Sequence, residues 1–290
     1  MRRHSVDRAA PIGVFDSGIG GLSVVQALRA ALPGESLIYV ADSAHTPYGE
    51  RGDAFITERT SAIAEYLRDV HGAKLLVIAC NTASAAAVHL VRHDNPGWPV
   101  VAVEPAIKPA ANHTRTRRVG VLATRSTLAS RKFAALRDTV MLGHPDVRFI
   151  EVPCDGLAAS IEQWANDGEG AASRELLARY LGELAELAGG MDAVDAVVLG
   201  CTHYPLIREE IQRMVPSHVV LIDSGTPVAR HVQRLLHSTG LLRPEPRGDA
   251  VTSGQVQLIA TGSTQTLQAA SLRWLEPLET TPLTLQSRAI

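Results

Sequence analysis

The sequence predicts an α/β protein made of two similar lobes, each a mostly parallel β-sheet flanked by helices. Short uninterrupted runs of Val, Ile and Leu alternate along the chain with longer amphipathic segments. This pattern is typical of buried parallel strands that are joined by helical crossovers. The chain has 290 residues, of which 46% are hydrophobic, and that length allows a sizeable core and favours two domains over one.

The predicted strands and helices follow one another in a regular order. Eight apolar runs have the composition of strands that are covered on both faces, at residues 12–15, 37–41, 75–80, 100–105, 119–124, 147–152, 196–201 and 219–223. Helical spacing of apolar residues occurs between them, at residues 21–32, 54–71, 126–137 and 173–187. The alternation of the two kinds of segment favours mostly parallel sheets.

Two parts of the chain show the same order of features. The segments "GVFDSG" (residues 13–18) and "GVLATRST" (residues 120–127) each begin a strand, a turn and a helix. Each also precedes, by some tens of residues, a strand that ends in a cysteine, Cys80 in the first case and Cys201 in the second. A repeated βα unit explains this order; the alternative is that any two α/β stretches look alike.

Cys80 and Cys201 each end an apolar run, in "LLVIACNTAS" and "AVVLGCTHYP". Open parallel sheets bind ligands beyond the carboxyl ends of their strands, where helix N-termini expose backbone N–H groups. The positive end of a following helix favours a thiolate and lowers its pKa, so both thiols are candidate bases or nucleophiles. The alternative is a small buried hydrophobe, which is our interpretation of Cys154 in "VPCDG" because it lacks the repeated setting.

Other polar residues stand where strands end. Asp16 and Ser17 follow the first apolar run and precede "GIGG", whose glycines permit a tight turn and a close backbone approach to a ligand. The second apolar run is followed by "ADSAHTPYGE", in which residues 47–49 form a turn that could present backbone donors. Glu162 is a further acid, with either a site role or a place at the surface.

Charge and cysteine content exclude several classes of protein. The chain has 28 basic and 30 acidic residues, so nothing in its charge indicates nucleic-acid binding. No apolar window approaches the roughly 20 residues that span a bilayer, and Asp7 and Arg8 interrupt the charged N-terminus where a signal peptide would be apolar. Three widely separated cysteines form neither a disulfide framework nor a metal cluster. We therefore expect a cytoplasmic protein with no metal and no membrane partner.

Four motifs spread over most of the chain resemble the glutamate racemases of the aspartate/glutamate racemase superfamily. They are "GVFDSGIGGLSV", "YVADSAHTPYGER", "ACNTASA" and "LGCTHYPL", in that order, and "LIDSGTPVA" at residues 221–229 is also similar. The resemblance implies two similar α/β lobes with the active site in the cleft between them. It places residues 1–103 and 216–290 in the first lobe and residues 104–215 in the second.

The resemblance implies cofactor-independent racemisation of L- and D-glutamate, which supplies D-glutamate for peptidoglycan. Inversion requires that a proton leave one face of the α carbon and that another arrive at the opposite face. In the family, the thiol that Cys80 matches takes the proton from D-glutamate, and the thiol that Cys201 matches takes it from L-glutamate. The α proton is very weakly acidic, so desolvation and stabilisation of the developing negative charge must assist the thiolate.

The resemblance also implies helpers for each thiol. Asp16 matches the family's acid near the first cysteine, and His203 matches the histidine near the second. An imidazole can hold or pass a proton there, because its ordinary pKa of about 6.5 suits the task. Glu162 aligns with a carboxylate that assists on the second side, although the flanking "CDGLAASIE" departs from the family's pattern.

Substrate recognition follows from the same motifs. The resemblance places the following residues at the substrate: Asp16, Ser17, Pro47, Tyr48, Gly49, Asn81, Thr82, Thr124, Thr202 and His203. The backbone of Tyr48 and Gly49 is expected near the side-chain carboxylate of the substrate. The motifs contain no arginine at these positions, so we expect neutral donors and helix ends to match the substrate's charge.

Three alternatives remain. An aspartate or hydantoin racemase would keep both thiols and change the carboxylate pocket, whereas a two-lobed amino-acid-binding protein would need no paired thiols. A pyridoxal phosphate racemase requires a Schiff-base lysine, and Lys74, Lys108 and Lys132 all lie outside the motifs. We therefore expect no cofactor. A homodimer is compatible with the resemblance, but the sequence does not determine the oligomeric state.

Overall fold

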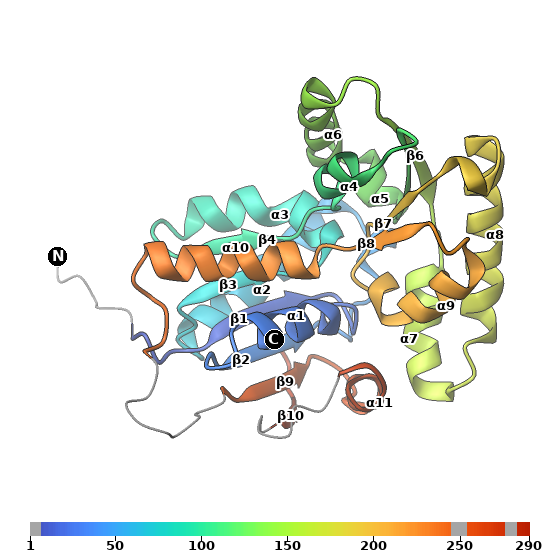
Figure 1. Ribbon diagram of the computed structural model, residues 1–290. Helices are drawn as coiled ribbons and strands as arrows, with labels where there is room; N and C mark the ends of the chain where they lie inside the picture. The colour runs from blue at the N-terminus through green and yellow to red at the C-terminus, as the bar shows by residue number, and fades with distance from the viewer. Residues whose placement is uncertain (1–6, 245–253, 276–282) are drawn as a thin grey trace, which may run out of the picture.

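The computed structural model describes residues 7–244, 254–275 and 283–290, and it contains two parallel sheets (Figure 1). The first sheet has six strands in the order β10-β9-β2-β1-β3-β4, and the second has four in the order β6-β5-β7-β8. Every neighbouring pair of strands is parallel. The predicted α/β class with two lobes is confirmed. Residues 1–6, which begin the segment considered above as a signal peptide, lie outside the described residues.

The strands are short, and those in the interior of each sheet are buried for most of their length. Their bounds are β1 Ile12–Asp16, β2 Leu37–Ala41, β3 Leu75–Ile78, β4 Val100–Ala102, β5 Arg118–Ala123, β6 Arg148–Pro153, β7 Ala196–Leu199, β8 Val220–Ile222, β9 Val256–Ala260 and β10 Leu283–Ser287. The eight strands predicted from apolar runs are β1 to β8. The first sheet continues through β9 and β10, which were not predicted.

Helices connect consecutive strands. Their bounds are α1 Leu22–Ala31, α2 Asp53–Asp69, α3 Asn81–Asp94, α4 Ile107–His113, α5 Arg125–Ala129, α6 Arg131–Gly143, α7 Leu157–Asp167, α8 Ala171–Ala188, α9 Arg208–Met214, α10 Gly225–Ser238 and α11 Gln265–Trp274. Short 3₁₀ helices occupy η1 Tyr48–Glu50, η2 Met191–Ala193 and η3 Tyr204–Ile207. The four predicted helical segments correspond to α1, α2, α5 with α6, and α8.

The two sheets share one strand order, which confirms the repeat seen in the sequence. β1 lies between β2 and β3, with β4 beyond, and β5 lies between β6 and β7, with β8 beyond. β3 and β7 are therefore equivalent strands, and each is followed within two residues by a cysteine, Cys80 or Cys201. Because the carboxyl ends of parallel strands meet at one edge of a sheet, each lobe presents its thiol at that edge.

The chain passes from the first lobe to the second near Glu104 and returns near Ser224. Ser224 donates its hydroxyl to the backbone oxygen of Glu104 at 2.5 Å, so the two crossing segments are hydrogen-bonded to each other. β8 pairs with β7 in the second sheet, whereas the expected return at residue 216 would place it in the first lobe. We propose the predicted division of the lobes with this correction, the return following Ile222.

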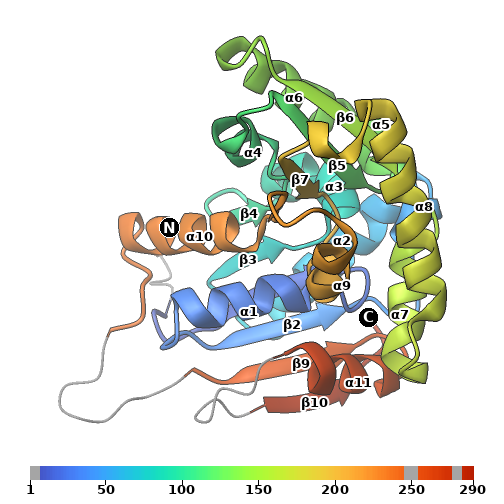
Figure 2. The same ribbon diagram turned by 45° about the vertical axis from the view of Figure 1, so that its right-hand side comes forward.

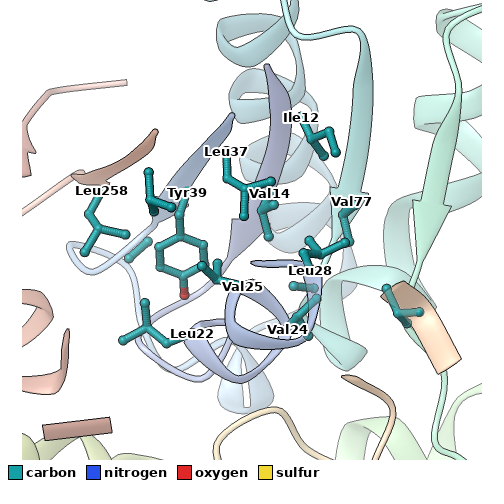
Figure 3. Close-up of a cluster of buried hydrophobic side chains, with 14 of the residues drawn as sticks. Ile12, Val14, Leu22, Val24, Val25, Leu28, Leu37, Tyr39, Val77 and Leu258 are labelled. Atoms are coloured by element: carbon teal, nitrogen blue, oxygen red, sulfur yellow. The ribbon is translucent and has the colours of Figure 1, made fainter. Parts of the chain in front are cut away.

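Helices cover both faces of each sheet. In the first lobe, apolar side chains of α1, α10 and α11 form one buried cluster and those of α2 and α3 another. In the second lobe, α7, α8 and α9 cover one face, and α4 and α6 cover the other. Figure 3 shows the α1 side of the first sheet, where Tyr39 lies near Leu22 and Val25 of α1. This double covering explains why the strands are continuous apolar runs.

The lobes also meet through α7 and α11, which lie side by side in both ribbon views (Figure 2). The rings of Trp164 on α7 and Trp274 on α11 pack edge to face, with centroids 6.1 Å apart. In the described parts of the chain, no helix is long and apolar enough to span a membrane, and no three His, Cys, Asp or Glu side chains are grouped as metal ligands would be.

Candidate active site

A cavity of about 560 Å³ lies between the two lobes, in the size range of small-molecule sites. The strand ends that carry the predicted residues meet there. Its lining includes all of the predicted site residues except Glu162, namely Asp16, Ser17, Pro47, Tyr48, Gly49, Cys80, Asn81, Thr82, Thr124, Cys201, Thr202 and His203. Glu162 lies behind His203, to which it is hydrogen-bonded.

Cys80 occupies the N-cap position of α3. Its Sγ accepts a hydrogen bond from the backbone N–H of Ala83 at 3.4 Å, as expected for a thiol at a helix N-terminus. The predicted lowering of its pKa is nevertheless wrong. Burial, followed by the nearby carboxylate of Asp16, raises the pKa of Cys80 above its usual range, and these effects outweigh the Ala83 N–H and the Ser17 hydroxyl.

A chain of hydrogen bonds connects Cys80 to Asp16. The Cys80 thiol donates to Oγ of Ser17 at 3.7 Å, and the Ser17 hydroxyl donates to Oδ1 of Asp16 at 3.2 Å. The Ser17 N–H also donates to Oδ1, at 2.6 Å. Burial raises the pKa of Asp16, although the positive charge of His203, the Thr202 hydroxyl and the Ser17 N–H act against it. The three side chains form a route for a proton between thiol and carboxyl.

The Cys201 thiol is held by side chains and not by a helix N-terminus. No α-helix follows it at once; a turn leads into η3, so the expected helix N-terminus is missing. Instead, its Sγ lies 3.6 Å from Nδ1 of His203, whose Nε2 lies 2.8 Å from Oε1 of Glu162. Burial lowers the pKa of His203, but the hydrogen bonds to Cys201 and Glu162 outweigh it and raise that pKa well above 6.5. An imidazolium donates from both nitrogens, so it can stabilise a Cys201 thiolate.

The glycines of "GIGG" make room for the opposite lobe. A Cβ atom on Gly18 would overlap Oε1 of Glu162, and one on Gly20 would lie 2.5 Å from Nδ1 of His203. The backbone N–H of Ile19, between them, donates to Oε1 of Glu162 at 2.8 Å. The sequence predicts that these glycines allow the backbone to approach a ligand closely. In the structure, Gly18 and Gly20 instead leave space for the side chains of Glu162 and His203.

Asp42 holds the turn that contains Tyr48. Its Oδ2 accepts hydrogen bonds from the Tyr48 hydroxyl and from Nε of Arg59 at 3.0 Å, and its Oδ1 accepts from Nη2 of Arg59 at 2.9 Å and from Thr261 at 2.7 Å. Burial raises the pKa of Asp42, but these hydrogen bonds outweigh burial and lower it to about 2. The turn is thus fixed to α2 and to the segment after β9, with Tyr48 and Gly49 lining the cavity.

Neutral polar groups line the seam between the lobes. Oδ1 of Asn81 is buried and has no hydrogen-bond partner among the described residues, and Asn81 lines the cavity. Oγ1 of Thr82 lies 3.4 Å from Oγ1 of Thr124 and 3.5 Å from Oγ of Ser126. First-lobe and second-lobe hydroxyls therefore face each other, and the Asn81 oxygen is a free acceptor for a ligand N–H group.

The cavity also contains residues that the sequence motifs did not identify. Arg125, Ser126 and Asp155 line it, so an arginine is present where only neutral donors were expected. Arg125 directly follows Thr124 in "GVLATRST", and this position beyond a strand end was the available signal. Cys154 also lines the cavity, but it is buried in the second-lobe core and its thiol donates to the backbone oxygen of Val152 at 3.4 Å.

Comparison with known proteins agrees with this geometry. Residues 13–232 match the family model described as Asp/Glu/Hydantoin racemase. The chain belongs to the Asp/Glu/hydantoin racemase family. The match covers more than half of the chain and includes both lobes, both thiols and all of the predicted site residues, so the motif resemblance is confirmed.

Relatives within the Asp/Glu/hydantoin racemase family include several glutamate racemases. The one from Pseudomonas paraeruginosa is 49% identical over 234 residues, which cover 81% of this chain and 84% of the relative. Among solved structures, Escherichia coli glutamate racemase in complex with L-glutamate and the activator UDP-MurNAc-Ala is 30% identical, with a TM-score of 0.77 over 97% of this chain and 98% of that one. The Francisella tularensis enzyme in complex with D-glutamate is 28% identical, with a TM-score of 0.77 over 97% of each chain.

Proposed function

We propose that this chain interconverts L- and D-glutamate by a two-base mechanism that uses Cys80 and Cys201 and no cofactor. The observation that carries the proposal is that one thiol from each lobe lines the same cavity, each with its own hydrogen-bonded relay. Two bases on opposite walls allow a proton to leave one face of the α carbon while another reaches the opposite face. A single base would tend to return the proton to the face it left.

In the direction from L-glutamate, Cys201 acts as the base. Its thiolate takes the α proton, and the His203 imidazolium, held by Glu162, stabilises the thiolate beforehand and orients it. The Cys80 thiol then delivers its own proton to the opposite face. The raised pKa of Cys80 suits this role, because its burial favours the protonated thiol.

In the direction from D-glutamate, the two thiols exchange roles. Cys80 must become a thiolate, and the route through Ser17 to Asp16 can accept its proton. The Ala83 N–H at the start of α3 then stabilises the sulfur anion. Cys201 returns a proton to the other face of the carbanion.

The carbanion is stabilised through the α-carboxylate, where negative charge develops. Ser17, Asn81, Thr82 and Thr202 line the cavity. The Ser17 and Thr202 hydroxyls already donate to Asp16, so the Thr82 hydroxyl and the Asn81 amide are the donors proposed for the α-carboxylate. The unpartnered Oδ1 of Asn81 is suited to accept from the substrate ammonium. Such fixed donors need little reorganisation during the reaction, which is the main source of electrostatic stabilisation in enzymes.

Glutamate is the substrate that the relatives favour, because the similar curated proteins are glutamate racemases and the similar structures hold L- or D-glutamate. The backbone of Tyr48 and Gly49 is the proposed contact for the side-chain carboxylate. The same resemblance implies that the chain makes D-glutamate for peptidoglycan in the cytoplasm. A homodimer stays a prediction, which sedimentation of the purified protein would test.

An aspartate or hydantoin racemase remains the principal rival, because it would share both thiols. The test is circular dichroism of L- and D-glutamate, L-aspartate and a 5-substituted hydantoin incubated with protein that has been dialysed against a chelator. We expect the circular dichroism signal of both glutamate enantiomers to decay and that of the other compounds to change little. Activity on aspartate or hydantoin alone would contradict the substrate, and activity that needs an added cofactor would contradict the mechanism.

A further inference from the structure

Arg125 and Asp155 form an ion pair at the edge of the cavity. Arg125 follows Thr124 at the end of β5, and Asp155 follows Cys154 after β6, the strand that pairs with β5. Nε and Nη2 of Arg125 lie 3.1 and 2.5 Å from Oδ2 of Asp155. Both residues line the cavity, and their side chains are 66% and 53% exposed, so the pair stands at the mouth.

The pair lies beside the turn that is proposed to receive the substrate's side-chain carboxylate. A Cβ atom on Gly49 would lie 3.6 Å from Cβ and Cγ2 of Thr124 and 3.9 Å from Oγ of Ser126. The backbone of Gly49 therefore approaches the residues on either side of Arg125. A carboxylate bound at Tyr48 and Gly49 would therefore lie beside the segment that carries Arg125.

Arg125 also stands out by its charge. It is the only arginine or lysine among the described residues that line the cavity. The other cationic group there, His203, is deep in the cavity and is already paired with Glu162. Glu50 of the first lobe also lines the cavity, but its side chain is an acid. Arg125 is therefore the one permanent cation in this lining, as far as the structure describes it, that can bind a second carboxylate on the substrate.

We propose that Arg125 and Asp155 act as a carboxylate-exchange pair that selects dicarboxylic amino acids. The substrate's side-chain carboxylate replaces Asp155 on the Arg125 guanidinium as the substrate settles against Gly49. This inference rests on the proposed function. It assigns the preference for a substrate with a side-chain carboxylate to Arg125, which lies outside the four motifs.

The exchange is energetically feasible for two reasons. An exposed ion pair contributes little net stability, so the loss of the Asp155 contact costs little. A guanidinium presents a planar fork of donors that binds any carboxylate in a similar geometry. Asp155 is then a competitor for the substrate, and its charge keeps Arg125 close to the mouth when the site is empty.

Three variants and one control test the pair. We expect Arg125→Gln to raise KM for both enantiomers about 10-fold, which corresponds to about 1.4 kcal/mol, with a smaller change in kcat. Arg125→Lys should recover part of the loss, since it keeps the charge without the fork. Asp155→Asn should lower KM. The control Arg131→Gln removes another exposed arginine of the same lobe, one that does not line the cavity.

Inhibition constants separate a direct contact from a general disturbance of the site. In Arg125→Gln, the Ki of glutarate, a dicarboxylate, should rise as KM does, whereas the Ki of norvaline, which has no side-chain carboxylate, should stay as in wild type. Equal increases for both inhibitors would show a structural role and overturn the inference. If the wild type racemises glutamate but Arg125→Gln leaves both the KM and the glutarate Ki unchanged, the inference is overturned and the proposed function stands. Absence of racemisation by the wild type would instead overturn the proposed function, and calorimetric binding of glutarate would still test the pair.

Discussion

Thr202 donates its hydroxyl to Oδ2 of Asp16 at 2.8 Å, across the boundary between the lobes. Thr202 follows Cys201 in the second lobe, whereas Asp16 ends β1 and connects through Ser17 to Cys80 in the first. The carboxyl group that serves one thiol is therefore held by the loop that carries the other. A change at this contact should affect both thiols.

We expect Thr202→Val to lower kcat/KM for glutamate by about 10- to 100-fold, the range for losing a buried hydrogen bond to a charged group. Valine keeps the volume of threonine but leaves Oδ2 of Asp16 without this donor. The equilibrium constant between enantiomers cannot change, so kcat/KM must fall equally in both directions. Thr139→Val, at an exposed position on α6, is the matched control. Wild-type kinetics in Thr202→Val would show that the contact is dispensable.

The two relays predict unequal effects on the two proton transfers. Asp16→Asn should slow the step in which Cys80 gains or loses its proton, and His203→Asn the corresponding step at Cys201. Because kcat/KM falls by the same factor both ways, the difference must appear in kcat and KM separately, or in primary deuterium isotope effects. The measurement compares isotope effects from α-deuterated L- and D-glutamate. Identical effects from both enantiomers in both variants would argue against separate roles.

Gly18→Ala tests the contact between the lobes at Glu162. The added Cβ would overlap Oε1 of Glu162, which must then leave His203 or the Ile19 N–H. Since general acid–base assistance contributes about 10²- to 10⁴-fold, we expect kcat to fall by about 10²-fold with the fold preserved by far-ultraviolet circular dichroism. Gly34→Ala is the control, because a Cβ atom there meets nothing within 4 Å. Equal activity of the two variants would contradict a role for Glu162.

Asp42→Asn predicts a stability change that depends on pH. The pKa of Asp42 is lowered to about 2 in the folded protein, from 3.8, so its carboxylate stabilises the fold above about pH 4 and loses that contribution as the pH falls toward 2. At pH 7 we expect the variant's free energy of unfolding to be about 2 kcal/mol lower. Urea titrations at pH 7 and pH 3 measure the difference, with the exposed Asp94→Asn as control. A difference that does not shrink at pH 3 would contradict this account.

Much of the fold could be predicted because buried parallel strands carry their own signal. β1 to β8 are continuous apolar runs, since helices cover both faces of each sheet. β10 shows why the rest could not: it is the edge strand of its sheet, and its sequence LTLQS is largely polar. The sequence also does not determine where the chain returns to the first lobe, because a three-residue strand such as β8 gives no sign of which sheet it joins.

The sequence predicts the positions of those site residues that directly follow a recognisable strand. Cys80 and Asp16 stand at strand ends, and that position alone brings them to the same edge of the sheet. Arg125 and Asp155 also follow strand ends, those of β5 and β6, but the sequence does not show which residues beyond a strand end line the cavity. The raised pKa of Cys80 could not be predicted either, because burial between the lobes outweighs the helix N-terminus.

The central claim is that Cys80 and Cys201 act on opposite faces of one substrate. The most direct measurement follows the first turnovers of pure L-glutamate in heavy water by proton NMR of the α position. We predict that deuterium accumulates in the D-glutamate product while the remaining L-glutamate stays largely protiated, and that Cys80→Ala and Cys201→Ala each abolish racemisation whereas Cys154→Ala does not. Early deuterium in the remaining L-glutamate, or substantial racemisation by either of the first two variants, would contradict the two-thiol account.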